Sequence, residues 1–374
     1  MTLSASLVGE NAVPLWGLSA AQRTRRIALA QGHRWLGSEL AGGGLLINAA
    51  FVFDPAWYRH LAENPGAMLT QGGVPVIAHV RSPGEANQIA AAMRTGAAPG
   101  KDHGLSELAI ERGPQVENKE LRKRVTPFVD ALIPRNVRAL ERASYFGAYK
   151  GVTDLLTKYL WPEWALVLTR IAARLTISPN QVTTLGLLLC LLATWQFWYG
   201  QYWAGMASGL AFMVLDTVDG KLARCTITSS KWGNIFDHGI DLVHPPFWWW
   251  AWAEGLRYWG QELAREQFIL LLTVIVGGYV VQRLIEGIFM RRNARMHIHV
   301  WQRIDSQFRL ITARRNPNIV ILFFATLAGR PDLGLVAVAW WTVLSCLFHL
   351  VRLVQSELAR TGSSPLRSWM ADTP

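Results

Sequence analysis

Cysteine is scarce in this chain of 374 residues, and the few cysteines show no pattern of a shared site. Cys190, Cys225 and Cys346 lie in or beside apolar segments and have none of the spacings that hold a metal ion. We therefore expect neither a disulfide framework nor a zinc site. The N-terminus also lacks a signal-peptide pattern, because no basic start is followed directly by an apolar run.

Acidic residues are in the minority. The chain has 26 Asp and Glu against 37 Lys and Arg, which gives a formal net charge of +11. A basic balance is typical either of nucleic-acid binding or of a cytoplasmic membrane face that meets anionic lipid and phosphorylated substrates. Hydrophobic residues make up 51% of the chain, and long apolar stretches dominate from about residue 183 onward. This half favours the membrane, and we expect no nucleic-acid partner.

Long apolar segments in the second half predict membrane-spanning helices, which need about 20 mostly apolar residues. Six segments are candidates: 183–199, 203–224, 232–256, 266–290, 317–329 and 333–357. The predicted fold is an all-α six-helix transmembrane domain over residues 183–360. Before it we expect a small α/β cytoplasmic domain over residues 1–140, then a linker over residues 141–182.

The basic residues between these spans indicate the orientation. Cytoplasmic connections are rich in Lys and Arg, and two connections stand out here. They carry Lys221, Arg224 and Lys231 after the second span, and Arg291, Arg292, Arg295, Arg303, Arg309, Arg314 and Arg315 after the fourth. We expect both termini on the cytoplasmic side of a bacterial-type inner membrane. Trp residues near the span ends fit an interfacial belt.

Residues 151–178 within the linker have an amphipathic pattern that carries Arg170 and Arg174. Such a segment is typical of a helix that lies on the membrane surface. A helix docked on the soluble domain is the alternative. In the N-terminal domain, residues 44–53 and 74–80 resemble strands, and residues 21–32 and 84–96 resemble helices that end near glycine. This alternation predicts the α/β domain.

Four aspartates at the adjoining ends of the second and third spans carry the strongest functional signal. Asp216 and Asp219 are three residues apart, and Asp237 and Asp241 are four apart, so each pair shares a helix face. An Asp at the centre of a span costs about 2.5–3.5 kcal/mol, and less near the interface. Clustered carboxylates without His or Cys suit hard divalent ions such as Mg²⁺, Mn²⁺ or Ca²⁺. Taken singly, each Asp is equally well explained as a helix-end charge.

Small residues accompany the aspartates and would admit a ligand. Gly220, Ala223 and Gly233 would let a large ligand approach the backbone closely, and Arg224 could donate a charge-assisted fork to a phosphate. A diphosphate bridged by two metal ions is the natural occupant of such a site.

These residues together resemble the signature of the CDP-alcohol phosphotransferase (CDP-alcohol phosphatidyltransferase) superfamily, D-x2-D-G-x2-A-R, a spacer, then G-x3-D-x3-D. The pattern is complete, from Asp216 to Arg224 and from Gly233 to Asp241. The resemblance implies six transmembrane helices, a cytoplasmic site, a CDP-linked donor, two divalent cations (Mg²⁺ or Mn²⁺) and a homodimer. It also implies that Asp216, Asp219 and Asp237 hold the metals and that Asp241 is the general base. Asn180 lies in a Ser-Pro-Asn stretch before the first span. This stretch resembles the Pro-Asn segment with which the family's membrane domain begins, and which usually lies near the nucleotide.

The N-terminal half has a fainter resemblance. Residues 14–32 are similar to the early segment of sugar-phosphate nucleotidyltransferases. Two features of that family are missing, since residues 1–13 hold no Gly-rich, Arg-containing loop and Asn48 stands where a metal-binding acid is wanted. We expect a degenerate, inactive relative.

Other polar residues near the predicted site can each be interpreted in two ways, as structural or as functional. His238 and His244 flank the aspartate pair and are interpreted as structural, although a ligand role is the alternative. Arg309, Arg314 and Arg315 follow from positive-inside topology alone. They could also bind the phosphate of an acceptor or of a lipid headgroup.

The sequence thus predicts transfer of the phospho-alcohol group of a CDP-alcohol to a hydroxyl acceptor, with release of CMP, in phospholipid or polar-lipid synthesis. The donor could be CDP-diacylglycerol or a polar CDP-alcohol such as CDP-inositol, and the acceptor a lipid or a polyol phosphate. A transporter or channel with an acidic cluster is the competing hypothesis. Transporters often show inverted repeats and sites near the bilayer midplane, whereas here the acids lie at one interface and no repeat is evident.

Overall fold

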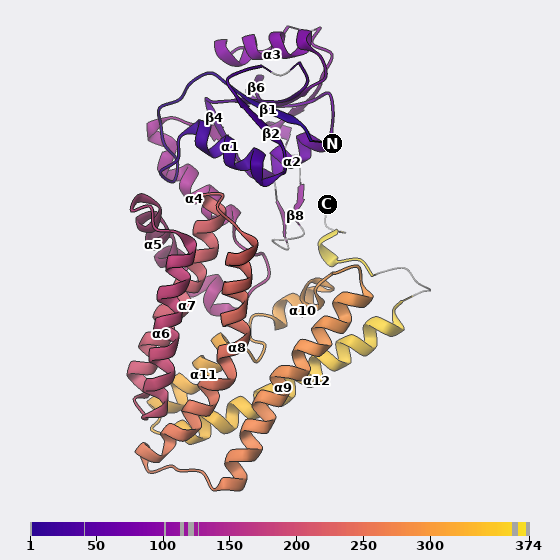
Figure 1. Ribbon diagram of the computed structural model, residues 1–374. Helices are drawn as coiled ribbons and strands as arrows, with labels where there is room; N and C mark the ends of the chain where they lie inside the picture. Colours follow the sequence, from indigo (N-terminus) through magenta and orange to yellow (C-terminus); the bar gives the residue numbers. More distant parts are fainter. Residues whose placement is uncertain are drawn as a thin grey trace. The chain divides into compact units, whose positions relative to one another are not determined.

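A computed structural model describes residues 2–40, 42–100, 102–112, 116–118, 123–125, 127–360 and 366–371. The chain forms two compact units, which are described separately (Figure 1). The first consists of Met1–Tyr149, Leu168–Ser178 and Gly220–Ser229, and the second of Lys150–Val167, Pro179–Asp219 and Ser230–Pro374.

A mixed six-stranded sheet is the centre of the first unit, with the strand order β2-β1-β3-β6-β5-β7. In that order the strands span Arg34–Gly37, Ser4–Val8, Gly44–Asn48, Val74–Val80, Ala67–Gln71 and Ser106–Ala109. Strand β6 is antiparallel to both of its neighbours, and the other neighbouring pairs are parallel. The predicted α/β character of the N-terminal half is confirmed.

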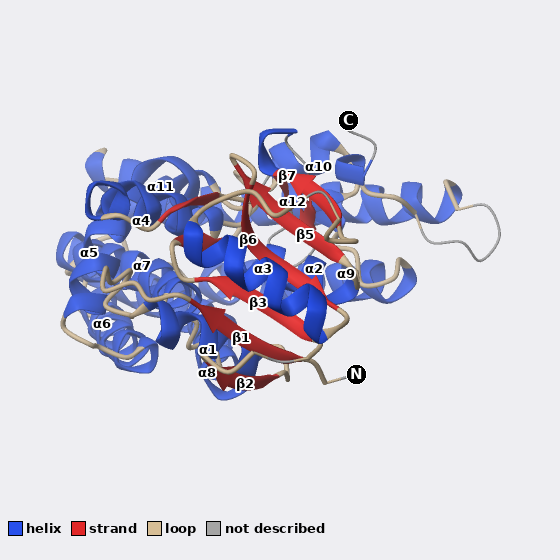
Figure 2. Cartoon of the chain, turned by 90° about the horizontal axis from the view of Figure 1, so that it is seen from above, coloured by secondary structure: helices blue, strands red, loops and turns tan. Residues whose placement is uncertain are grey.

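Helices cover both faces of this sheet, as Figure 2 shows for α3. They are α1 (Ala20–Ala30), α2 (Pro55–Glu63) and α3 (Pro83–Thr95). On one face, Ile27 of α1 and Trp57 of α2 join Ile77 in a buried core. On the other face, Ile89 of α3 packs with Met68. Burial of this apolar surface on both sides is the main stabilising contribution to the unit.

Short polar side chains begin these three helices. Ser19 forms a capping box with Gln22 at α1, and the side chains of Asp54 and Ser82 accept hydrogen bonds from the first turns of α2 and α3. Each cap satisfies an amide that has no partner within its helix. Helix α3 ends at Gly96, whose φ of 65° lies in the left-handed region that glycine adopts at little cost.

The segment predicted as one strand, residues 44–53, is two strands. After β3 the chain turns, and β4 (Phe51–Phe53) pairs with β10 (Val129–Ala131) instead of joining the large sheet. The strand at 74–80 and the helices at 21–32 and 84–96 are confirmed as β6, α1 and α3. The first unit also contains the antiparallel pair β8 (Val116–Asn118) and β9 (Lys123–Val125), the short helices η1 (Ile110–Arg112) and η2 (Pro134–Asn136), and α4 (Val137–Gly147).

Asn48 ends β3 with a side chain that is bound to the protein backbone. Its amide nitrogen donates to the Pro75 carbonyl at 2.9 Å, and its amide oxygen accepts from the Ala50 amide at 3.0 Å. The side chain is only 2% exposed. These contacts fix the turn between β3 and β4, which is a structural role for the position where an acid was wanted.

The second unit is helical. Its long helices are α6 (Pro179–Trp198), α7 (Tyr202–Cys225), α8 (Lys231–Gly255), α9 (Arg265–Arg292), α11 (Arg315–Leu327) and α12 (Pro331–Leu358), and the end of α7 belongs to the first unit. Shorter pieces are η3 (Leu156–Leu160), η4 (Leu256–Trp259), η5 (Ile298–Val300), α10 (Arg303–Phe308) and η6 (Trp369–Ala371). Each of the six predicted spans coincides with one of the long helices.

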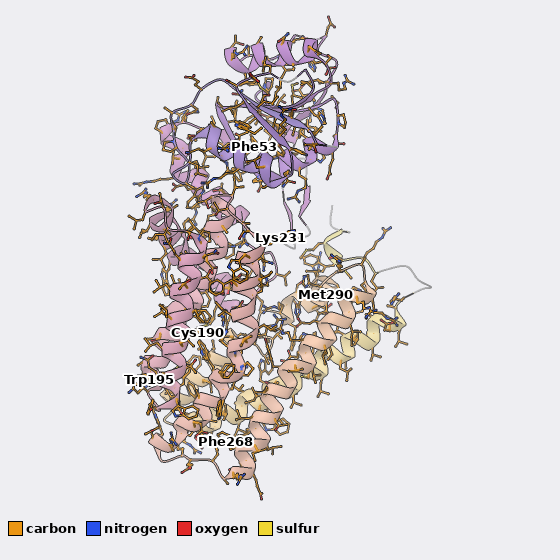
Figure 3. The ribbon with its side chains drawn as sticks, viewed as in Figure 1. Phe53, Cys190, Trp195, Lys231, Phe268 and Met290 are labelled. Atoms are coloured by element: carbon orange, nitrogen blue, oxygen red, sulfur yellow. The ribbon has the colours of Figure 1, made fainter. Side chains whose placement is uncertain are left out.

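Three of these helices, α6, α9 and α12, are long and apolar enough to cross a membrane, within the described residues. Along α6, Cys190 is buried whereas Trp195 is 53% exposed (Figure 3). Phe268 and Met290 mark the two ends of α9 in the same view. Large exposed apolar side chains on long helices are expected where lipid, and not water, is the solvent. Helices α7 and α8 carry the motif charges, and α11 is short.

Helix α5 (Pro162–Arg174) lies within the predicted amphipathic segment. Its residues Trp164, Val167 and Ile171 are exposed. In the first unit, Arg170 Nε lies 2.7 Å from Glu141 Oε2 on α4. One face of the helix therefore contacts protein while apolar side chains remain exposed, so membrane contact remains a prediction.

Two adjacent prolines interrupt the hydrogen bonding of α8. Pro245 and Pro246 have no amide hydrogen, so the carbonyls of Asp241 and Leu242 lose their usual helical donors. Tyr279 of α9 donates its hydroxyl to the Leu242 carbonyl at 3.1 Å. A side chain of the neighbouring helix thus replaces one of the two missing donors.

Candidate functional site

The motif aspartates lie where α7 ends and α8 begins. Asp216 and Asp219 precede the last turns of α7. Helix α8 is capped by Ser230, whose hydroxyl accepts from the Gly233 amide at 3.0 Å. Asp237 and Asp241 follow in the next turns of α8, with Lys231 at its first position (Figure 3).

Three carboxylates meet in the second unit. Asp216, Asp237 and Asp241 each offer an oxygen, and these atoms all lie within 4.8 Å of one another. Asp216 and Asp237 are partly buried, and Asp241 is exposed. Carboxylate oxygens at this spacing are the donor set that hard divalent cations prefer. The residues present therefore fit a divalent cation.

Asp219, the fourth motif aspartate, is oriented by a different contact. It is 3% exposed, and the Thr183 hydroxyl of α6 donates to its Oδ2 at 2.6 Å. Asp241, and not Asp219, belongs to the group of three described above. The metal role of Asp219 and the base role of Asp241 stay predictions. Sequence reasoning missed Thr183, because a threonine near the start of an apolar span carries no signal of its partner.

Arg315, at the start of α11, joins two of the three carboxylates. It donates to Asp216 Oδ2 at 2.9 Å and to Asp241 Oδ1 at 2.8 Å. Its guanidinium also lies over the ring of Phe212, 4.8 Å from the centroid. A cationic group thus already stands among oxygens that would hold a metal ion. The sequence singled out Arg315 as an anion-binding candidate, but not this pairing.

Asn180 and Gly233 lie close together in the second unit, and their assignment to the nucleotide stays a prediction. A Cβ on Gly233 would come 2.9 Å from Asn180 Oδ1 and 3.1 Å from the Ser230 hydroxyl. A larger residue at position 233 would therefore require the Asn180 side chain to move. This contact supplies a reason for Gly233 besides the predicted approach of a ligand.

The remaining signature residues, Gly220, Ala223 and Arg224, belong to the first unit. A Cβ on Gly220 would lie 3.0 Å from Arg224 Nη2, one turn further along α7. The guanidinium of Arg224 therefore folds back along its own helix toward Gly220. Both residues are partly exposed, which is compatible with the predicted phosphate contact.

A buried polar network lies beside Arg315. Asp154 is 6% exposed and accepts hydrogen bonds from the Thr157 amide at 3.0 Å, the Thr157 hydroxyl at 2.8 Å and the Asn316 amide at 3.0 Å. Burial raises the pKa of Asp154, but the charge of Arg309 and these hydrogen bonds outweigh it and hold the pKa below the ordinary value of 3.8. Asp154 is therefore a buried carboxylate, and sequence reasoning did not single it out.

A second group with metal-ligand chemistry consists of Glu286, His299 and His349, all buried. Arg314 pairs with Glu286 and lies 3.1 Å from His299 Nε2. Burial lowers the pKa of His299 well below its usual range, more than Glu286 raises it. We interpret this group as a structural network, because none of its members belongs to the signature and its one carboxylate is paired with Arg314.

The two histidines that flank the motif make local contacts. His244 Nδ1 lies 2.7 Å from the Ile240 carbonyl, and the ring packs against Phe212 and Trp248. His238 Nδ1 lies 3.0 Å from the Asn234 carbonyl and 3.4 Å from Asp237 Oδ2. These contacts fit the structural interpretation of His244, and they leave His238 beside the carboxylates.

Comparison with known proteins finds a family profile that is similar to the segment with the signature. The profile of the CDP-alcohol phosphatidyltransferase family matches residues 176–313. Cholinephosphotransferase 1 of Gallus gallus is 34% identical over 127 residues, which are 31% of this chain and 36% of that protein. Archaetidylinositol phosphate synthase of Pyrococcus horikoshii is 29% identical over 186 residues, 50% of this chain and 86% of that protein. Human cholinephosphotransferase 1 is 33% identical over 132 residues, 32% of this chain and 30% of that protein.

The matched chain therefore spans about a third of the length of these cholinephosphotransferases and most of the archaeal synthase. The whole signature, from Asp216 to Asp241, lies inside the matched range. The segment of this chain from residue 176 to residue 313 is thus similar to the CDP-alcohol phosphatidyltransferase family.

Proposed function

We propose that this protein transfers the phospho-alcohol group of a CDP-alcohol to a hydroxyl acceptor and releases CMP. The observation that carries the proposal is the meeting of Asp216, Asp237 and Asp241 within 4.8 Å, inside the family domain. Carboxylates in such a cluster repel one another unless cations lie among them. A donor with a diphosphate, which brings its own negative charge, needs the same cations.

The proposed cofactors are two divalent cations, Mg²⁺ or Mn²⁺, held by Asp216, Asp219 and Asp237. When bound, they would neutralise the diphosphate and stabilise the leaving CMP. Arg315 has to give up its contacts with Asp216 and Asp241 wherever a cation takes the same oxygens. Thr183 keeps the Asp219 carboxylate in a fixed orientation through its hydrogen bond.

The chain's own part in the chemistry falls to Asp241. Its carboxylate takes the proton of the acceptor hydroxyl as the acceptor oxygen attacks the phosphorus distal to cytidine. The bond between that phosphorus and the bridging oxygen breaks, and its electron pair leaves with CMP. Arg315 donates to Asp241 Oδ1, so it occupies one of the two oxygens that could accept this proton.

The donor and the acceptor would contact different residues. Asn180, Gly220, Ala223, Arg224 and Gly233 are the proposed nucleotide and diphosphate contacts. Arg309, Arg314 and Arg315 are proposed to attract the acceptor or its phosphate, although Arg314 and Arg315 each contact a carboxylate in the structure.

The substrates are proposed by class. The names of the relatives do not agree on the alcohol, since one group is named for choline phosphate transfer and another for archaetidylinositol phosphate synthesis. We keep CDP-diacylglycerol and a polar CDP-alcohol such as CDP-inositol as donors, and a lipid or polyol phosphate as acceptor. The proposed setting is a homodimer with six spans per chain in a bacterial-type inner membrane, with the termini and the site on the cytoplasmic side.

The test is product analysis of the purified full-length protein by mass spectrometry. A panel of CDP-alcohols, including CDP-diacylglycerol, CDP-inositol and CDP-choline, is incubated with lipid and polyol phosphate acceptors and Mg²⁺ or Mn²⁺. We expect CMP and a phosphodiester product from at least one donor, and none after chelation of the metal.

Two variants of the same chemical type sharpen this test. Asp216→Asn should abolish CMP release and weaken Mn²⁺ binding. Asp332→Asn, which alters an aspartate paired with Arg330 at the start of α12, should change neither. Normal turnover of Asp216→Asn would show that the carboxylate cluster is not the metal site, and no CMP from any donor would contradict the function itself.

A further inference from the structure

The carboxyl end of α7 is held by side chains of the N-terminal sheet unit. The last carbonyls of a helix have no partner within it. Arg23 of α1 donates to the Cys225 carbonyl at 3.4 Å, and Arg26 of α1 donates to the Thr226 carbonyl at 2.7 Å. Cationic donors at this position also interact favourably with the helix dipole. All of these residues belong to the first unit.

Arg23 is buried and has a second acceptor in the same unit. It is 6% exposed, and its second terminal nitrogen donates to the Phe53 carbonyl at the end of β4 at 3.2 Å. The guanidinium therefore joins the backbone of β4 to the end of α7. Arg26 is partly buried, whereas Arg25 between them is exposed.

Ile227, immediately after α7, adopts a backbone conformation that its side chain disfavours. Its φ is 53°, in the left-handed region that β-branched residues rarely occupy. The same side chain packs against the buried core formed by α1, α2 and the sheet. A strained residue persists only where its surroundings fix it. The core of the N-terminal unit is what holds the chain in this turn.

A second contact lies one turn earlier on α7. Lys221 is 4% exposed, donates to the Ala148 carbonyl at 2.8 Å and lies 3.4 Å from the ring centroid of Tyr149. The signature residues Ala223 and Arg224 therefore lie between two places where the N-terminal unit contacts α7. A shift or fraying of this end would move both of them.

We propose that the N-terminal α/β unit is a positioning domain, in which Arg23 and Arg26 fix the end of α7 and so the placement of residues 220–224 for the donor. This inference rests on the proposed function. It gives the unit a task that needs no nucleotidyltransferase chemistry. Arg23 and Arg26 are positioning residues, because they act through α7 and not on the substrate.

The experiment compares Arg26→Ala, Arg26→Lys and Arg25→Ala in the full-length protein. Arg25→Ala removes the same charge one residue away at an exposed position, so it is the matched control. We expect Arg26→Ala to raise the KM for the CDP-alcohol about tenfold, as loss of a hydrogen bond from a charged donor implies, with a smaller change in kcat. Arg26→Lys, which can still donate to Thr226, should restore part of the loss. Arg25→Ala should match the wild type.

Amide hydrogen exchange of the peptide covering residues 220–229 gives a readout that does not depend on turnover. Exchange should be faster in Arg26→Ala than in Arg25→Ala, because the amides of Thr226 and Thr228 bond back to the last turns of α7. Equal exchange and equal KM in the two variants would overturn the proposal. If exchange is faster in Arg26→Ala but neither the wild type nor any variant forms CMP, the result would support the role of Arg26 in holding the end of α7. It would contradict the proposed function instead. Faster exchange with an unchanged KM would show that Arg26 holds the end of α7 without affecting donor binding, and this result would also overturn the proposal.

Discussion

Asp219 differs from the other motif aspartates in being buried against a hydroxyl on another helix. A hydrogen bond of 2.6 Å from Thr183 fixes its orientation, and hydrogen bonds to charged acceptors are stronger than neutral ones. Asp241, by contrast, is exposed and lies within reach of Arg315. The two residues thus differ in burial and in their partners, and the metal role of Asp219 and the base role of Asp241 remain proposals.

The variant Asp241→Asn distinguishes a role in donor binding from a role in the chemical step. Asparagine keeps the shape and removes the proton acceptor, so CMP release should fall by about 10²–10⁴. Donor affinity, measured by calorimetry, should change little, because the proposed donor contacts lie on other residues. Turnover is followed as CMP release in the same preparation.

Two results would contradict this assignment. Normal turnover would exclude Asp241 as the base. Loss of donor binding as complete as in Asp219→Asn would make Asp241 a metal ligand, in keeping with its place in the group of three carboxylates. His238, 3.4 Å from Asp237, is the next candidate for the base.

The spacing of the aspartates could be read from the sequence, because residues three and four apart share a helix face. The partners of these residues could not. Arg315 is 99 residues from Asp216 and 74 from Asp241, and Thr183 is 36 from Asp219. No local pattern encodes such pairs, since they arise only when separate helices pack together.

Among the elements, long apolar runs were predictable and short strands were not. The six predicted spans coincide with helices because each is a mostly apolar run of a dozen residues or more, which is enough for several helical turns. Strands β1, β2, β5 and β7 were not predicted, since they have only four or five residues each. The break between β3 and β4 depends on the Asn48 side chain, whose partner Pro75 lies on another strand.

The segment before α5 gives a pH-dependent prediction. Asp154 receives hydrogen bonds from Thr157 and Asn316, and its pKa in the folded protein lies below 3.8, the ordinary value. A carboxyl whose pKa is lowered by folding stabilises the protein above its unfolded pKa, and this contribution is lost as the pH falls through the folded value. The melting temperature of the wild type in detergent should therefore drop as the pH falls below about 4.

Asp154→Asn should lack this component of the acid dependence. It should also melt at a lower temperature at pH 7, because a broken buried hydrogen-bond network costs about 1–3 kcal/mol. Asp102→Asn, at an exposed position of the first unit, is the control and should follow the wild type. Parallel pH curves for Asp154→Asn and the wild type would refute the role of the Asp154 charge.

For the whole molecule, the prediction concerns the N-terminal unit. The full-length protein should release no pyrophosphate from CTP and a phospho-alcohol such as inositol phosphate, with Mg²⁺ present. Asn48 is bound to backbone groups, and the residues after β1 hold no Gly-rich, Arg-containing loop. A known cytidylyltransferase added to the same mixture is the positive control. Pyrophosphate formed by this protein alone would make it bifunctional.

The proline pair of α8 has a mechanical consequence. Helices bend most easily where prolines remove backbone hydrogen bonds, and Pro245 and Pro246 come directly after the turn that carries Asp241. The proline pair therefore divides α8 into two parts, and the Tyr279 hydroxyl of α9 donates to the backbone at this point. A helix in a bilayer tilts or bends to match the thickness of the lipid. If α8 crosses the bilayer, as proposed, a bend at the proline pair would change the direction of its Trp-rich part without moving the part that carries the carboxylates.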